Sequence, residues 1–313
     1  PAGPLLIGLG ESLFDCLPDS MKLGGAPVNL AVHANALLEA QGGAALPATR
    51  IGDDELGAKY LSELTDRGLS TIGVQTDPEH PTGRVLVEID ASGHASYDFE
   101  ANVAWDYLEM TPRWSRLAQR SSVVAFGTLA QRSPQSRQVL LGFLSEANNA
   151  IKLFDVNLRG DFYSADVLRD SLQFASAVKL NEEELDRVHR LLFPDSPTGQ
   201  DAEPRIREIC DRFDLKWLAL TRGARGTLLF YRDRVWDSEP VKWEGDAHPH
   251  ADTVGAGDAC CASLITGMLL DWPPERTLAL ANRVGAYVAS QPGATPRLPE
   301  SLLELTHPSG GSS

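Results

Sequence analysis

The chain has 313 residues, of which 42% are hydrophobic and 23% charged. A chain of this length can bury about three quarters of its unfolded surface, and this composition is ordinary for a globular protein. The formal net charge is −15, whereas nucleic acids and anionic membranes bind basic patches. We therefore expect neither as a partner. The four cysteines follow no disulfide or metal spacing, and a cytoplasmic location is the expectation.

Apolar runs alternate with amphipathic stretches along the chain, a pattern typical of a layered α/β fold. Several apolar runs are nearly continuous, as expected of parallel strands that are buried on both faces. The sequence predicts strands at 4–9, 44–49, 122–126, 150–155, 177–180, 217–221 and 227–231. It predicts helices at 28–38, 55–66, 136–148, 182–192, 204–213 and 259–270. We expect one domain over residues 1–305 and a disordered low-complexity tail over 306–313.

The segment from 82 to 107 has a different pattern. Residues 83–90 and 94–100 alternate between apolar and polar side chains, and residues 91–93 have the composition of a turn. This alternation predicts an antiparallel hairpin with one covered and one solvated face. Together with residues 12–24, the hairpin would form a small sheet that projects from the main body.

The segment Asp252-Thr-Val-Gly-Ala-Gly-Asp258 precedes a run of small and apolar residues that predicts a buried helix. The first N–H groups of a helix have no partner within it, and together with the helix dipole they favour an anion. Glycines at 255 and 257 let a phosphate approach this backbone closely. Asp258 would repel that phosphate unless it had a further role, such as taking a proton from a hydroxyl. A helix cap with a tight turn explains the motif alone equally well.

A second motif, Leu23-Gly-Gly-Ala-Pro-Val-Asn-Leu-Ala31, pairs a flexible glycine corner with Asn29 near the start of another helix. Together the two motifs resemble the signatures of the ribokinase-like (PfkB) carbohydrate kinase family, and the chain looks most similar to bacterial fructokinases. Segments 10–15, 50–57, 155–159, 179–184 and 221–226 resemble further motifs of the family, in the expected order. The resemblance implies a three-layer α/β/α fold with a mainly parallel central sheet and a small β-sheet lid.

The resemblance also implies a sugar site between the lid and the main sheet. Its expected sugar-binding residues are Asp15, Gly24, Gly25, Asn29, Tyr97, Phe99, Arg159 and Asp258. Asp258 would be the general base, and the amides of Gly255, Ala256, Gly257 and Asp258 would form an anion hole. Four of these residues have a plainer alternative here. Asp15 would be a solvated aspartate at a strand end, and Asn29 a polar residue of a first helical turn. Tyr97 and Phe99 would pack within the lid.

On the nucleotide side, the resemblance implies contacts of Thr221, Gly223, Gly226, Gly255 and Gly257 with the phosphates of ATP. Asn181 and Glu184 match an element associated with Mg²⁺, with Glu184 acting through water. Asn282 would border the adenine, and Asp252 would bound a monovalent-cation site, so K⁺ is a candidate cofactor. The plainer alternatives are a glycine-containing hairpin at 221–226, a helix cap at Asn181 and a helix-surface asparagine at 282.

These residues predict the ATP-dependent phosphorylation of a free sugar at a primary hydroxyl, with fructose giving fructose 6-phosphate. Ribose, ketodeoxygluconate and another hexose stay open as substrates, as does a sugar sensor without turnover. A dinucleotide-binding oxidoreductase, suggested by Gly8-Leu-Gly10, is excluded because Leu13 takes the third glycine position and Pro18 interrupts the helix that should follow. A homodimer through the lid is a further expectation, because the alternation at 85–89 suits pairing across a dimer as well as burial over the sugar.

Overall fold

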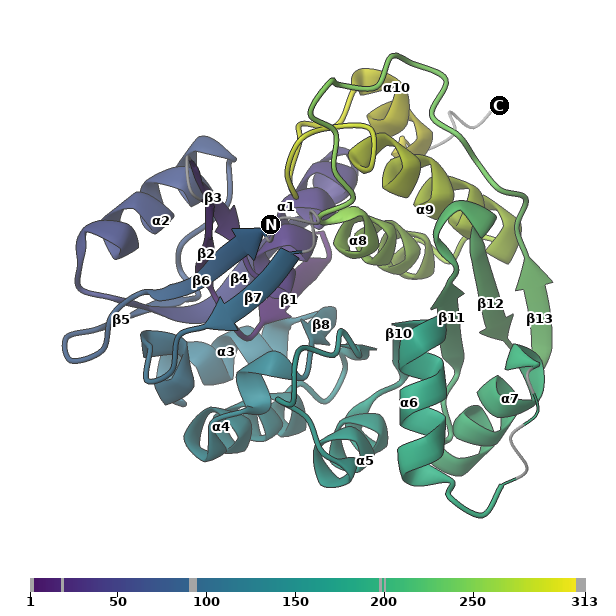
Figure 1. Cartoon of the computed structure of the whole chain (residues 1–313), viewed down its shortest axis with the longest axis horizontal. Helices are drawn as coiled ribbons and strands as arrows, with labels where there is room; N and C mark the ends of the chain where they lie inside the picture. The colour runs from purple at the N-terminus through teal and green to yellow at the C-terminus, as the bar shows by residue number, and fades with distance from the viewer. Residues whose placement is uncertain (1–2, 18–19, 90–94, 197–198, 200, 308–313) are drawn as a thin grey trace.

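A computed structural model describes residues 3–17, 20–89, 95–196, 199 and 201–307. Within these residues, nine strands form one sheet in the order β13-β12-β11-β10-β9-β8-β1-β4-β5 (Figure 1). The parallel strands are β1 (Leu5–Leu9), β4 (Ala44–Gly52), β5 (Val74–Asp77), β8 (Val123–Phe126), β9 (Ile151–Asp155), β10 (Ala177–Asn181) and β11 (Trp217–Thr221). Two antiparallel strands, β12 (Thr227–Tyr231) and β13 (Arg234–Asp237), complete one edge.

Helices cover both faces of this sheet (Figure 1). One hydrophobic cluster joins the sheet to α3 (Pro112–Arg120), α4 (Pro134–Glu146), α5 (Ala165–Phe174), α6 (Glu182–Leu192) and α7 (Ala202–Phe213). The other joins it to α1 (Ala26–Leu38), α2 (Glu55–Asp66), α8 (Ala256–Leu269), α9 (Pro274–Val288) and α10 (Glu300–Leu303). Neighbouring strand residues such as Leu6 and Ile7 belong to opposite clusters, because successive side chains of a strand point to opposite faces. The predicted three-layer α/β fold is confirmed.

Four further strands form a small separate sheet in the order β3-β2-β6-β7. They are β2 (Leu13–Leu17), β3 (Ser20–Gly24), β6 (Gly83–Ile89) and β7 (Ala95–Phe99). The predicted hairpin is confirmed, since β6 and β7 pair antiparallel, and β2 joins β6 in parallel. We call these four strands the lid. The predicted turn at 91–93 lies outside the described residues.

The predicted element bounds agree best where a helix has a clear cap. Helices α2 and α6 have the predicted bounds, and the side chains of Asp54 and Asn181 cap their first turns. Helix α8 begins earlier than predicted, because Gly255 is its N-cap with φ 75°. Thr306, predicted to open the tail, is buried and ends the short helix η5 (Glu304–Thr306), while 308–313 lie outside the described residues.

None of the helices in the described part of the chain combines the length and apolar character that crossing a membrane requires. The helices are instead amphipathic or packed between the sheet and their neighbours, as α8 is with nine buried residues of its 14.

The packing of α4 on α3 gives a direct test of the core. Phe143 is fully buried and meets Trp114 edge to face, with ring centroids 5.7 Å apart. We expect Phe143→Ala to lower the free energy of unfolding by about 3–5 kcal/mol, since it leaves a cavity. The control is Ile72→Ala, because Ile72 is 49% exposed and should change stability by less than about 0.5 kcal/mol. Urea unfolding measures both, and equal midpoints for the two variants would contradict this packing.

Candidate active site

The two glycine motifs meet through side chains on the first turns of α1 and α8. Nδ2 of Asn29 donates to Oδ2 of Asp258 at 2.9 Å, although the two residues are 229 positions apart. Gly25 precedes α1 with φ 105°, and Gly255 precedes α8 with φ 75°. A Cβ on Gly25 would lie 2.9 Å from the carbonyl oxygen of Glu11, and one on Gly255 would lie 2.4 Å from that of Ala294. Both helix starts therefore require glycine.

The first turn of α8 is an open site for an anion. No side chain caps this helix, and Gly255, Ala256, Gly257 and Asp258 are all partly exposed. The amide of Ala256 donates to the carbonyl oxygen of Thr253 at 3.3 Å. The first N–H groups of a helix have no partner within it, so those of Gly257 and Asp258 can bind a phosphate together with the helix dipole. Of the predicted anion-hole residues, Gly255 is thus the N-cap, and Ala256, Gly257 and Asp258 form the first turn of the helix.

Asp258 has the electrostatic setting of a base that titrates close to neutrality. Burial raises the pKa of Asp258 to about 6, and the charge of Asp155 also raises it. The hydrogen bond from Asn29 lowers this pKa, as do the charges of Lys179 and Arg159. The carboxyl is therefore mostly ionised at pH 7 and accepts a proton readily, which suits a general base.

Two residues to which the sequence analysis assigned no role, Lys179 and Asp155, lie buried beside this turn. Nζ of Lys179 is 3.1 Å from Oδ1 of Asp155, and each residue is 5% exposed. Burial lowers the pKa of Lys179, but the charges of Asp155 and Glu184 raise it and hold it above its usual range. The signal available in the sequence was Lys179 inside the apolar strand β10 and Asp155 at the end of β9, because charged residues are rarely buried unless paired.

Arg159 and three carboxyl groups form the side of the site nearest the lid. Arg159 is exposed on the loop after β9, and its positive charge lowers the pKa of Glu11, Asp15 and Asp258. Burial raises the pKa of Glu11 to about 7, and its Oε2 lacks a hydrogen-bond partner in the described structure. Sequence reasoning gave Glu11 no role. The four residues come from different elements, so only the fold brings them together.

The lid residues are only partly where the sequence placed them. Asp15 lies in β2, within the predicted lid segment 12–24, but in the middle of the strand and not at its end, and burial raises its pKa. Its Oδ2 would lie 2.6 Å from a Cβ on Gly24, so a glycine makes room for this carboxylate. Phe99 contacts Phe162 edge to face at 5.8 Å, outside the lid. Tyr97 belongs to β7, and its side chain lies outside the described part of the structure.

Residues predicted for the nucleotide lie at the carboxyl ends of β10 and β11, where Asn181 and Thr221 are paired in register. Oδ1 of Asn181 accepts from the amide of Glu184 at 2.9 Å, which confirms the helix-cap alternative. The Glu184 carboxylate accepts from the amides of Asn181 and Leu158 at 2.8 and 3.0 Å. Gly223 and Gly226 have φ 57° and 78° in the connection from β11 to β12, a geometry that a hairpin and a phosphate loop both require.

The last two predicted residues are held by the protein itself. Asn282 is buried and not on the helix surface; its side chain accepts from Oγ1 of Thr227 at 2.9 Å and donates to Oγ of Ser238 at 2.6 Å. Oδ2 of Asp252 accepts from the amide of Gly293 at 2.9 Å and lies 3.8 Å from Nζ of Lys22. The Asp252 loop is therefore tied both to the loop at 291–294 and to the lid.

The described residues include no group of three or more His, Cys, Asp or Glu side chains arranged to hold a metal ion. Mg²⁺ keeps several waters and takes most of its other ligands from phosphates, so a magnesium site does not require such a cluster. Each carboxylate oxygen of Glu184 accepts one amide hydrogen, and a carboxylate has further lone pairs for a metal-bound water. The residues present thus suit an indirect magnesium contact.

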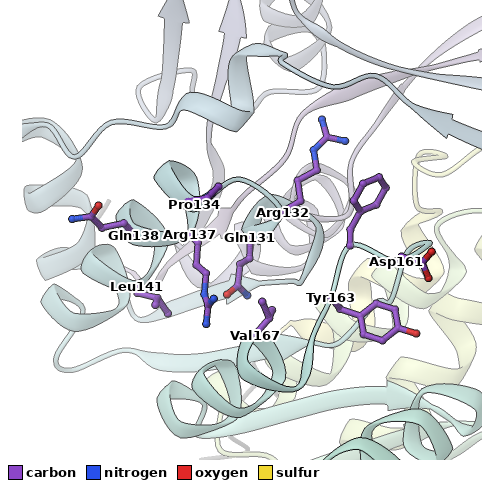
Figure 2. A pocket seen from close by; sticks show the side chains of 10 residues that line it. Gln131, Arg132, Pro134, Arg137, Gln138, Leu141, Asp161, Tyr163 and Val167 are labelled. Carbon is purple, nitrogen blue, oxygen red and sulfur yellow. The ribbon is translucent and has the colours of Figure 1, made fainter.

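A cavity of about 600 Å³ lies beside the loop that follows Arg159, between α4 and α5 (Figure 2). None of the predicted site residues lines it. Its walls are formed by Gln131, Arg132, Pro134, Arg137, Gln138, Leu141, Asp161, Phe162, Tyr163 and Val167. The chemistry-bearing residues instead surround the start of α8.

Comparisons with known proteins show what this chain is similar to. A model for the pfkB family carbohydrate kinases matches residues 16–301. A fructokinase of Escherichia coli is 30% identical over 310 residues, which cover 93% of this chain and 95% of that protein. Among solved structures, a fructokinase from Xylella fastidiosa with bound ATP has a TM-score of 0.81 at 23% identity and covers 96% of this chain and 97% of its own. A double-mutant fructokinase from Vibrio cholerae with fructose, ADP and potassium ion has a TM-score of 0.77 at 21% identity, with coverage of 97% and 98%.

The start of α8 gives a test that needs no substrate. We expect Gly255→Ala to lower the free energy of unfolding by about 1–3 kcal/mol, because the position has a positive φ and a Cβ would strike the backbone of Ala294. The matched control is Gly142→Ala in α4, where a Cβ meets nothing within 4 Å. This substitution should raise the free energy of unfolding by about 0.5–1 kcal/mol, because alanine is favoured over glycine inside a helix. Thermal or urea unfolding measures both changes. If Gly255→Ala also stabilised the protein, the described start of α8 would be wrong.

Proposed function

We propose that this chain, which belongs to the PfkB family of carbohydrate kinases and is an ATP-dependent sugar kinase, phosphorylates a primary hydroxyl of free fructose. The product would be fructose 6-phosphate. The observation that carries the proposal is the hydrogen bond between Asn29 and Asp258 at the open start of α8. This contact brings a carboxylate and a side-chain amide together at the start of a helix, which supports a site for a sugar hydroxyl beside a phosphate. The fructokinase names of the relatives support fructose as the sugar.

Asp258 acts as the general base in this proposal. It takes the proton of the primary hydroxyl while that oxygen attacks the γ-phosphorus of ATP in line. The hydrogen bond from Asn29 fixes the carboxylate, and the remaining lone pairs of the carboxylate face the reacting hydroxyl. The amides from Gly255 to Asp258 stabilise the charge that develops on the transferred group.

The sugar lies between the lid and the start of α1. Asp15 accepts hydrogen bonds from sugar hydroxyls, Gly24 and Gly25 let the backbone approach, and Asn29 binds a vicinal pair of hydroxyls. Arg159 contacts the sugar or the transferred phosphate through its planar fork, and Phe99 and Tyr97 cover the sugar. A sugar phosphate fits less well, because the one basic residue in the first lid strand of the hairpin, Arg84, is paired with Glu100 at 2.7 Å.

The nucleotide lies along the carboxyl ends of β10 and β11. Thr221, Gly223 and Gly226 contact its phosphates with Gly255 and Gly257, and Asn181 lies beside them. The side chain of Asn282 stabilises the connection that contains Gly223 and Gly226, since it is hydrogen-bonded to Thr227 and Ser238. Mg²⁺, when bound, neutralises phosphate charge, and Glu184 would hold it through a water. K⁺ would be bounded by Asp252, near the loop at 291–294.

Other sugars are the second candidate, and the sites named above do not depend on which sugar reacts. Ribose, ketodeoxygluconate and other hexoses carry the same kind of primary hydroxyl. The alternative of a sugar sensor without turnover has no support in the site, which retains Asp258 and the open helix start.

Removing the base carboxylate tests the proposed mechanism. We expect Asp258→Asn to lower kcat by about two to four powers of ten, the usual contribution of a positioned base. The matched control is Asp211→Asn, because Asp211 is exposed on α7 and should keep the wild-type rate. Steady-state ADP release measures both. Near-normal turnover of Asp258→Asn would show that another group takes the proton.

A sugar panel tests the substrate. ADP release is measured with fructose, glucose, mannose, ribose and ketodeoxygluconate, each with and without K⁺. We expect the highest kcat/KM with fructose, and a stimulation by K⁺ that Asp252→Ala removes. A higher kcat/KM with another sugar would show that this sugar, and not fructose, is the preferred substrate, and it would leave the proposed mechanism unchanged. Stimulation that survives in Asp252→Ala would place the cation elsewhere.

A further inference from the structure

A buried ion pair lies directly behind the proposed anion hole. Lys179 on β10 and Asp155 on β9 are partners in the parallel register of the two strands. Nζ of Lys179 is 3.1 Å from Oδ1 of Asp155, and both residues are 5% exposed. Burying two charges costs free energy that their attraction only partly offsets, so a pair of this kind is weak evidence for stability alone.

The ammonium group also reaches the first turn of α8. Nζ of Lys179 lies 3.3 Å from the position of a Cβ on Gly257, the central residue of the proposed anion hole. Oδ2 of Asp155 is buried and has no hydrogen-bond partner among the described residues. The pair therefore spans from the sheet to the backbone that would hold the transferred phosphate.

The charges around Asp258 come from several elements. Asp155 and Lys179 act from the sheet, Arg159 acts from the loop after β9, and Glu11 acts from the connection between β1 and the lid. Glu184 on α6 and Cys261 on α8 interact with Lys179, and the neutral Asn29 donates to Asp258. Lys179 is the buried cation in this group, whereas Arg159 is exposed.

We propose that Lys179 and Asp155 are a positioning pair for phosphoryl transfer, in which Lys179 supports the first turn of α8 and supplies positive charge behind it. Asp155 holds the ammonium in that place. Neither residue touches the sugar or the nucleotide in this proposal, and it rests on the proposed role of Asp258 as the base. The reason is electrostatic. Without the charge of Lys179, a phosphate, Asp258, Asp155 and Glu184 would place several negative charges close together in a poorly solvated site, where they repel one another strongly.

The test is the pH dependence of kcat/KM, which reports the base of the free enzyme. The rate of the wild type should fall as the pH drops through about 6, where Asp258 becomes protonated. This fall at low pH is the acid limb of the profile. K179M removes a charge that lowers the pKa of Asp258, so the midpoint of the acid limb should move to a higher pH by about one unit. D155N removes a charge that raises this pKa, so the limb should move down. In K179M, kcat on the plateau should also fall by up to about 100-fold, the effect of a misplaced reacting group.

Matched variants separate positioning from folding. K179M leaves Asp155 and Glu184 without their counter-charge, so the double variant K179M/D155N, which removes both members of the pair, is measured beside it, and thermal unfolding checks that each variant is folded. The double variant should return the acid limb close to that of the wild type while kcat stays low. K216M controls for the lysine substitution, because Lys216 is exposed.

The outcomes distinguish this inference from the assignment of the base. If folded D155N and the double variant keep the wild-type limb and the wild-type kcat, the pair is purely structural and the inference is overturned. If D258N retains the acid limb of the wild type, the base itself is misassigned. Opposite shifts in D155N and K179M, with loss of the limb in D258N, would support both.

Discussion

The hydrogen bond between Asn29 and Asp258 is the contact on which the rest of the site depends. It joins the first turns of two helices that lie side by side on one face of the sheet (Figure 1). These helices approach closely because small side chains such as Ala34 and Ala262 are fully buried in the cluster they share. Asp258, the proposed base, is therefore held by the packing of two helices and not by a loop. Rigid support of this kind is what a reacting group needs, since small displacements are costly.

The electrostatics of the site resolve an apparent conflict in the composition. A chain with a net charge of −15 must accept ATP beside a cluster of carboxyl groups. Backbone donors at the start of α8, the buried Lys179 and the exposed Arg159 supply positive potential where it is needed. Lys179, Arg159 and the hydrogen bond from Asn29 lower the pKa of Asp258, while burial and Asp155 raise it. Burial and Asp155 outweigh the lowering effects and raise the pKa of Asp258 to about 6, so the proposed base is still mostly ionised at pH 7.

The sequence predicted what local patterns determine and missed what depends on register between distant segments. The bounds of α2 and α6 follow from capping residues such as Asn181, which act within one turn. Asp15 was expected at a strand end, but it lies in the middle of β2, where the pairing of β2 with β3 sets it opposite Lys22. Lys179 and Asp155 were inside segments that resembled family motifs. Their pairing follows from the alignment of β9 with β10, which no single segment specifies.

The lid contacts two loops that bear charged residues, the loop with Arg159 and the loop with Asp252. Phe99 on β7 packs against Phe162, three residues beyond Arg159. On the other side, Lys22 on β3 lies 3.8 Å from Asp252, just before the start of α8. A sugar held under the lid would thus be bound by a sheet that already contacts both the Arg159 loop and the Asp252 loop. Because one element touches both loops, the proposed function would couple covering the sugar to placing charge at the transferred phosphate, and such coupling would favour transfer to the sugar over transfer to water.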